Sequence, residues 1–378
     1  MLRLVLMRLV FALVVIVAVL AVVLYGRYGG GQPYPNLSGT PVLEESALEV
    51  VVTSPEPIGN VAVSADGRIF YTIHPESRPT GAKLLEWVDG VPTAFPSEEA
   101  QASFETPLGV VVDQQHRLWV IDHGNHGTGA PRLLAFDLET GAVAHDHEFD
   151  SSVAELGSFL QDLQVDSTGK HVFIADVSFW RKNPGLVVYD VEAKSARRVL
   201  DGDESVSPQD WLIRNPTKDM KFFGGLVVLK PGVDGIAIDR NDQWIYYGAM
   251  AHDTMFRVKV ADLLDASLSP GALAARVEPV GEKPLNDGLS TDNEGNLLIT
   301  DVEHRSVMRM SPQGELTTLV TSPRVRWADA LSYGPDGWLY LADSAIPDQM
   351  LRSKAHMKEM APYYIFRFKP GIDGVPGQ

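Results

Sequence analysis

Four aspartates recur at one position of a sequence repeat, and together they could bind a cation. Asp162, Asp234, Asp287 and Asp329 stand in the short segments LQDLQVD, VDGIAID, NDGLSTD and ADALSYG. Carboxylates gathered around one axis repel each other unless a bound cation relieves the repulsion. Their oxygens are hard ligands and the chain has no Cys, which favours Ca²⁺ over Zn²⁺. The alternative is that each aspartate caps a turn by binding neighbouring backbone N–H groups.

Further polar and aromatic residues could complete such a site. Asn60 and Gly109 occupy the equivalent positions in IGNVAVS and LGVVVD, and Asn60 is a predicted ligand-binding residue. Trp180 and Trp327 are predicted to wall a pocket for an apolar or aromatic ligand, with core packing as the alternative. His252 is a predicted general base because His titrates near neutrality. A loop His without a catalytic role is the alternative.

A second set of polar residues lies where the next strand of each repeat ends. Asp122, Asp176, Asp301 and Asp343 recur in register there, which predicts a repeated turn or a hydrogen bond between neighbouring units. His74 ends the corresponding strand of the first unit. In the HGNHG segment, His123 and His126 could bind a metal, although their spacing is not specific for one.

These residues require a framework of short strands arranged around an axis. The apolar segment that carries the axial residue occurs six times, and a second, often aromatic strand follows each copy. Units of roughly 40 to 50 residues with three or four strands are typical of propeller blades. The longest interval, between Asp162 and Asp234, contains a predicted inserted loop at Pro208–Lys221. We therefore predict an all-β, six-bladed β-propeller over residues 47–370, closed by pairing Ala47–Thr53 with Tyr363–Phe368.

An apolar segment precedes the repeats. Arg3 and Arg8 stand before the uninterrupted apolar run Leu9–Tyr25, which is near the lower length limit for crossing a bilayer. Positive charges before an apolar segment stay in the cytoplasm, which places the residues after the segment on the other side of the membrane. No convincing cleavage site lies before Tyr25, which favours an uncleaved anchor over a signal peptide. Residues 1–28 are thus the predicted signal anchor or signal peptide, 29–46 a tether that is flexible at Gly29–Pro35, and 371–378 a C-terminal tail. The propeller is expected on the periplasmic or extracellular side, membrane-anchored, or secreted if the segment is removed.

Charge and missing motifs exclude several function classes. The net charge is −17, so the surface repels phosphate backbones and nucleic acid is not an expected partner. GxSxG, Gly-rich phosphate-loop and HExxH motifs are absent from the sequence, which leaves serine-hydrolase, nucleotide-dependent and zincin chemistry unsupported. The expected partners are a small molecule and, through the N-terminal segment only, a membrane.

Three stretches together resemble a known family. They are RLWVIDHGNHGTGAPRLLAFDLETG (117–141), FIADVSFWRKNPGLVVYDVEAKSARRV (173–199) and GVDGIAIDRNDQWIYYGAMAHDTMFRV (232–258). In order and spacing they resemble the major royal jelly protein/yellow family of six-bladed propellers. The resemblance implies the fold strongly and a reaction weakly, because some insect yellow members are linked to dopachrome tautomerisation while royal jelly members are secreted binding or nutrient proteins.

The wider relatives are the gluconolactonase/senescence-marker propellers, which bind a divalent cation on the central axis. The chain departs from the royal jelly pattern by lacking Cys, and its axial aspartates lean toward the lactonase-like relatives. The first functional hypothesis is therefore an exported, membrane-tethered propeller that binds a small molecule at the central channel. The alternative is a calcium-dependent lactonase- or esterase-like hydrolase, with the four axial aspartates as ligands and one of them or His252 as the base. An interaction scaffold that uses the rims is a third hypothesis.

Overall fold

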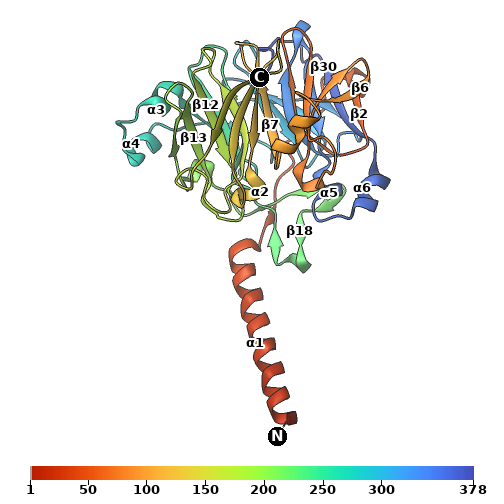
Figure 1. The fold of residues 1–378 in the computed structure, drawn as a ribbon, viewed down its shortest axis with the longest axis vertical. Coiled ribbons are helices and arrows are strands. Elements are labelled where there is room, and N and C mark those ends of the chain that lie inside the picture. Colours follow the sequence, from red (N-terminus) through yellow and green to blue (C-terminus); the bar gives the residue numbers. More distant parts are fainter. Residues whose placement is uncertain (1) are drawn as a thin grey trace.

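Six four-stranded antiparallel sheets surround one axis in the computed structural model, which describes residues 2–378 (Figure 1). This confirms the six-bladed β-propeller predicted from the repeat. The chain enters the first five blades at the innermost strand, and strands that are neighbours in the chain pair with one another. The sixth blade takes its outermost strand from the segment before the first blade. Short strands joined by tight turns produce this architecture because each unit covers its apolar faces by packing on the blades beside it.

The strands of the six blades are as follows. The first blade holds β3 (Ile58–Val63), β4 (Ile69–Ile73), β5 (Leu84–Val88) and β6 (Val91–Ala94), and the second holds β7 (Pro107–Val112), β8 (Arg117–Asp122), β9 (Arg132–Asp137) and β10 (Val143–Glu148). The third holds β11 (Leu160–Val165), β12 (His171–Asp176), β13 (Gly185–Asp190) and β14 (Ser195–Val199), and the fourth holds β20 (Val233–Ile238), β21 (Trp244–Ala249), β22 (Thr254–Lys259) and β23 (Glu278–Glu282). The fifth holds β24 (Leu289–Thr291), β25 (Leu297–Asp301), β26 (Ser306–Met310) and β27 (Leu316–Thr321), and the sixth holds β28 (Ala328–Tyr333), β29 (Leu339–Asp343), β30 (Tyr363–Phe368) and β2 (Glu49–Ser54).

The two ends of the propeller sequence meet in the sixth blade. Strand β2 pairs antiparallel with β30, as the sequence predicts, and Val52 lies opposite Ile365. Both side chains are fully buried. The pairing closes the ring, so the first and last blades do not present an open gap to solvent.

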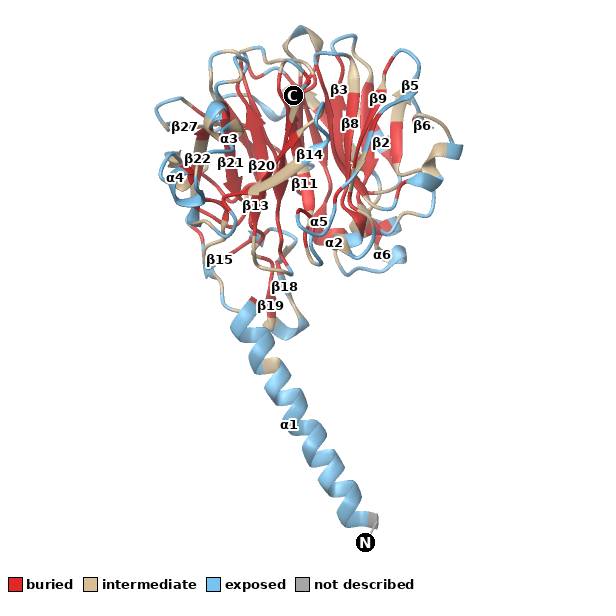
Figure 2. Ribbon diagram, turned by 60° about the vertical axis from the view of Figure 1, so that its left-hand side comes forward, coloured by how far each residue is buried: buried red, intermediate tan, exposed pale blue. Residues whose placement is uncertain are grey.

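The core lies between the blades. Inner strands such as β3 and β20 are buried along their whole length, whereas the loops and the N-terminal helix are exposed (Figure 2). Large aromatic side chains, among them Trp119 and Tyr189, pack between neighbouring blades. Burial on both faces explains why the inner strands are continuous apolar runs rather than alternating patterns.

Several short elements lie outside the blades. The inserted loop forms β15 (Trp211–Leu212), β16 (Arg214–Asn215), β17 (Lys218–Asp219), β18 (Lys221–Phe222) and β19 (Val227–Val228). The short helices are α2 (Gly124–Gly127), α3 (Val260–Leu264), α4 (Pro270–Ala274), α5 (Ile346–Gln349) and α6 (Lys354–Met360). The insertion, α2, α5 and α6 lie at the end of the propeller from which the N-terminal helix projects (Figure 1).

The N-terminal helix α1 (Leu2–Tyr28) projects away from the propeller and exposes its apolar side chains (Figure 2). Within residues 2–378, one helix is long and apolar enough to cross a membrane, and it covers Arg3–Tyr28. Helix α1 is therefore a candidate membrane span or signal anchor.

The segment that follows α1 is not the flexible tether predicted at Gly29–Pro35. Its strand β1 (Gln32–Pro33) pairs parallel with β15 of the insertion. The amide of Gly31 donates to Asp210 Oδ1 (2.9 Å), and the buried Tyr34 donates its hydroxyl to the carbonyl of Lys283 (2.9 Å). The prediction was based on the glycines, which allow the backbone many conformations. It failed because burial of the Tyr34 ring holds the segment against the propeller.

The C-terminal residues also pack against the propeller. The amide of Tyr333 donates to the carbonyl of Gln378 (2.7 Å), and the amide of Gly377 donates to the carbonyl of Tyr333 (2.8 Å). The amide of Val112 donates to the carbonyl of Gly377 (3.3 Å). The last residues thus cover the end of the central channel that lies opposite α1 (Figure 1).

Candidate functional site

A repeated backbone irregularity sits where five of the six inner strands begin. The pairing of the inner strand with its neighbour shifts register between Ile58 and Val61, and equivalent shifts occur in β7, β11, β20 and β28. The shifted stretches contain the predicted axial residues Asn60, Gly109, Asp162, Asp234 and Asp329. Such β-bulges turn a side chain out of the regular alternation. The bulges place these residues at the axis, near the α1 end of the channel.

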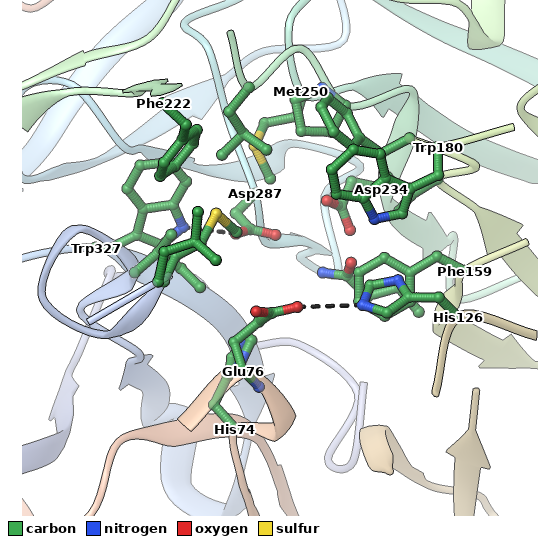
Figure 3. Close-up of a pocket in the computed structure, with 18 of the residues that line it drawn as sticks. His74, Glu76, His126, Phe159, Trp180, Phe222, Asp234, Met250, Asp287 and Trp327 are labelled. Carbon is green, nitrogen blue, oxygen red and sulfur yellow. Dashed lines mark hydrogen bonds and ion pairs between the residues drawn. The ribbon is translucent and has the colours of Figure 1, made fainter. Parts of the chain in front are cut away.

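A pocket of about 210 Å³ opens at this end of the axis (Figure 3). Its walls are mostly apolar and come from several blades and from the insertion. They include Phe159, Phe179, Phe222, Met250 and Ile346. Aromatic and aliphatic walls around a few polar groups are typical of small-molecule sites.

Three predicted metal ligands, Asp234, Asp287 and Asp329, lie together in this pocket. All three are buried, and each has one carboxylate oxygen without a hydrogen-bond partner among residues 2–378. Burial raises the pKa of each carboxyl well above its usual value, and the mutual repulsion of the aspartates adds to this effect. Carboxyls in such a setting hold protons until a positive group or hydrogen-bond donor reaches them.

The fourth predicted ligand, Asp162, lies outside this pocket. Together with Asn60 it lines a smaller interior cavity of about 20 Å³. Asn60 Nδ2 donates to Asp162 Oδ1 at 2.9 Å. Burial raises the pKa of Asp162 to about 7, and the Asn60 hydrogen bond partly opposes the rise. Asn60, a predicted ligand-binding residue, thus contacts Asp162 rather than the main pocket.

Both predicted tryptophans line the main pocket. Trp327 is buried, and its indole Nε1 donates to Asp287 Oδ2 at 2.6 Å (Figure 3). Trp180 lies at the mouth, where 45% of its surface is exposed. Trp327 therefore orients a floor carboxyl, whereas Trp180 is available to contact a ligand or another surface.

Besides Gln161, three polar residues that were not assigned to the axial site also line the pocket. His126 Nε2 lies 3.2 Å from Glu76 Oε1 (Figure 3), and His74 Nε2 lies 3.8 Å from Asp329 Oδ2. Burial lowers the pKa of His74 to about 4, so its imidazole is neutral at pH 7. Burial pushes the pKa of Glu76 upward, but the hydrogen bond to His126 and the neighbouring imidazoles outweigh it and lower the pKa. The position of His74 at a strand end was the available sequence signal, while nothing in the sequence marked Glu76.

The predicted general base, His252, does not line the pocket. Its Nδ1 accepts a hydrogen bond from the Thr254 amide (2.9 Å), and its ring packs edge-on against Phe256. Burial, with a contribution from nearby Lys283, lowers the pKa of His252 to about 4. This placement agrees with the alternative of a loop histidine.

A buried lysine near the floor was missed in the sequence. Lys283 is fully buried and donates from Nζ to the carbonyls of Ala249 (2.9 Å) and Pro284 (3.3 Å). Burial lowers its pKa to about 7, while the charges of Asp253 and Asp234 act in the opposite direction. Lysine is rarely buried, and no local pattern distinguishes Lys283 from a surface lysine.

The second set of aspartates binds backbone amides, but the bonds of Asp122, Asp176 and Asp343 lie within one blade and not between neighbouring units as one of the two predicted alternatives had it. Asp122 accepts from the amides of Glu105 and Thr106, and Asp176 accepts from the amide of Phe159. Each carboxylate thereby holds the chain segment that enters the inner strand of its own blade. Asp343 acts in the same way in the sixth blade, where it accepts from the amides of Arg326 and Trp327. Asp301 instead binds the amides of Glu303 and His304.

Calcium is suited to the donor atoms of the site but not to their spacing. The unpartnered carboxylate oxygens are hard donors. Among residues 2–378, however, no group of three or more His, Cys, Asp or Glu side chains lies at metal-binding spacing. The four predicted ligands Asp162, Asp234, Asp287 and Asp329 therefore do not form a coordination sphere in this arrangement.

The fold and site define a six-bladed propeller with an apolar axial pocket over buried carboxyl groups. A sequence profile described as "Major royal jelly protein" matches residues 106–323, which is more than half of the chain. The protein belongs to the major royal jelly protein family. A search of curated proteins found no significant match.

Solved structures confirm the propeller fold at low sequence identity. A luciferin-regenerating enzyme superposes with a TM-score of 0.58 and 11% identity, covering 87% of this chain and 97% of its own. A calcium-binding protein, regucalcin, from Agrobacterium tumefaciens superposes with a TM-score of 0.56 and 14% identity, covering 86% of this chain and 96% of its own. A gluconolactonase from Xanthomonas campestris superposes with a TM-score of 0.54 and 15% identity, covering 90% of this chain and 97% of its own. At these identities the likeness establishes the fold alone.

Proposed function

We propose that the protein is a membrane-tethered binding protein that holds a small molecule in the axial pocket. The observation that carries the proposal is the combination of apolar walls with buried carboxyl oxygens that have no hydrogen-bond partner among the described residues. Such a site selects a ligand with an apolar body and a positively charged or hydrogen-bond-donating end. The arginines before the apolar part of α1 support placing the propeller across the membrane from the cytoplasm.

Ligand charge provides the test. We expect the full chain in detergent to bind phenethylamine at least tenfold more tightly than 3-phenylpropionate, which has a similar body and the opposite charge. The Asp234→Asn, Asp329→Asn double variant should weaken amine binding roughly tenfold, because a hydrogen bond to a charged group contributes about 1.5–3 kcal/mol. Isothermal titration calorimetry measures both effects, and Asp89→Asn at an exposed turn serves as the matched control.

The affinity for the amine should rise between pH 5 and pH 8. A bound cation favours the ionised carboxylate, and burial keeps these carboxyls protonated at low pH. Equal binding of amine and acid, or a flat pH dependence, would contradict the proposed selectivity. Absence of binding by both probes would count against an aromatic ligand in this pocket.

The alternative function is a calcium-dependent lactonase or esterase. The hard oxygen donors of the floor and the fold shared with regucalcin and gluconolactonase favour it, whereas the ligand spacing does not. Calcium chloride added in the same calorimetric series distinguishes the two functions. Stoichiometric calcium binding that is lost in Asp234→Ala, Asp287→Ala would favour the hydrolase.

A further inference from the structure

The end of α1 is fastened to the pocket end of the propeller. The hydroxyl of Tyr28 donates to the carbonyl of Trp180 (2.7 Å), and Arg27 Nη2 donates to the carbonyl of Arg181 (2.7 Å). Lys230 Nζ donates to the carbonyl of Gly29 (2.5 Å). The apolar run ends at Tyr25, and three further residues of helix rise only about 4.5 Å. A bilayer crossed by α1 would therefore lie close to the mouth of the pocket.

Exposed apolar side chains surround this mouth. Trp180, Phe223 and Leu351 line the pocket and are 45%, 64% and 60% exposed. They come from three separate segments: the loop after β12, the insertion, and the loop between α5 and α6. Three large apolar groups held together in water are unfavourable unless another apolar phase covers them. We call these three residues the apolar rim.

The loops that carry the apolar rim are basic although the chain is acidic overall. Segment 180–184 contains Arg181 and Lys182 and no acidic residue. Segment 350–360, which covers the loop after α5 and helix α6, contains three Lys or Arg residues and one acidic residue, Glu359. Segment 214–230 contains four basic residues and one acidic residue, Asp219. The chain as a whole has a net charge of −17. Aromatic side chains next to Lys and Arg are typical of the water–membrane interface, where the cations are attracted to anionic headgroups.

We propose that the apolar rim inserts into the interfacial layer of the lipid bilayer, so that the pocket opens toward the headgroups. The inference rests on the proposed membrane span by α1 but does not depend on which ligand binds. Attachment at Tyr28 sets the orientation, the apolar rim supplies the insertion, and the basic loops supply attraction to anionic lipid. A molecule would then reach the pocket through the membrane surface.

Single-cysteine labelling tests the contact, since the chain has no Cys of its own. The full-length variants Phe223→Cys and Leu351→Cys are labelled with bimane and reconstituted into vesicles of phosphatidylcholine and phosphatidylglycerol. We expect lipids with a nitroxide near the headgroup to quench both labels at least twofold. Ala65→Cys is the control, because Ala65 is exposed in the turn after β3, at the opposite end of the channel.

Each outcome decides a separate point. Flotation of the labelled protein with the vesicles establishes the tether, and flotation without quenching at either rim position would overturn the rim contact alone. Loss of flotation would overturn both. Labels that are shielded from water but not quenched by lipid would assign the rim to a second copy of the chain and also overturn the proposal. In vesicles of phosphatidylcholine alone, we expect weaker quenching at both rim positions.

Discussion

Burial controls the protonation of the residues at the pocket floor. The pKa values of Asp234, Asp287 and Asp329 lie well above their usual range because burial disfavours the charged form and the carboxyls repel each other. Burial has the opposite effect on His74, whose pKa falls to about 4. At neutral pH the floor is therefore less charged than its composition suggests, and a cationic ligand would displace protons from it.

The interior carboxyl of Asp162 makes a pH-dependent contribution to stability. Its pKa is about 7 in the folded protein and 3.8 for an unperturbed aspartate, so its stabilising effect is complete below about pH 4 and is lost as the pH rises through 7. Each tenfold change in proton affinity corresponds to about 1.4 kcal/mol. We expect Asp162→Asn to become more stable than the wild-type chain by a few kcal/mol at pH 8, with a much smaller difference at pH 4.

Chemical denaturation of both proteins between pH 4 and pH 8 measures this difference. Comparing the two proteins removes the contribution of His74, whose lowered pKa makes stability rise with pH in both of them. A difference in unfolding free energy that stays constant across this range would contradict the assigned pKa.

At the level of the strands, close approach near the axis shapes the site. Inner strands of neighbouring blades come so near that small residues are required beside the axial positions. A Cβ added to Gly109 would lie 2.1 Å from the carbonyl oxygen of Gln161, and one added to Gly235 would lie 2.3 Å from the carbonyl of Asp287. Strand pairing aligns Gly109 with Gly235, the residue after Asp234. The close approach therefore explains why both blades have glycine at this position.

Substitution of Gly109 tests this account of the inner strands. We expect Gly109→Ala to lower the free energy of unfolding by about 1–3 kcal/mol, because the added methyl must displace the backbone of the neighbouring blade. Gly39→Ala is the matched control, since no atom of the described part of the chain lies within 4 Å of its added Cβ. Thermal or chemical denaturation measures both variants, and equal stability of the two would show that the blades separate at little cost.

For the whole molecule, the insertion joins the propeller to helix α1. It supplies pocket residues such as Phe222 and Val227, and its strand β15 pairs with β1 just after α1. Asp210 accepts hydrogen bonds from the amide of Gly31 (2.9 Å) and from Lys230 Nζ (2.7 Å). The orientation of the pocket relative to α1 therefore depends on these contacts rather than on a free linker.

Removing the side chain of Asp210 should loosen this connection without unfolding the propeller. In Asp210→Ala we expect amide hydrogen exchange at Gly31 to accelerate several-fold, because one hydrogen bond contributes about 1 kcal/mol. Hydrogen-exchange mass spectrometry of the full chain provides the measurement. Asp219→Ala, an exposed position on the same insertion, should leave the exchange at Gly31 unchanged. Rapid exchange at Gly31 already in the wild-type chain would contradict the docked arrangement.

The sequence by itself determined the repeated and local features. Six copies of a strand pattern predicted six blades, the apolar Ala47–Thr53 and Tyr363–Phe368 predicted the closing pair, and the run Leu9–Tyr25 predicted the N-terminal helix. Each of these follows from the order of apolar, polar and turn residues over short distances, and that order is fully written in the sequence.

Only the tertiary structure decided which side chains share a cavity. His74 and Glu76, from the first blade, line the same pocket as Asp329 of the sixth, while His252 lies outside it and Asp162 lines a separate cavity. Burial of Lys283 and docking of Tyr34 likewise depend on contacts between residues far apart in the chain. Such contacts are set by packing between blades, and neither spacing nor composition encodes where a side chain of one blade meets its partners from another.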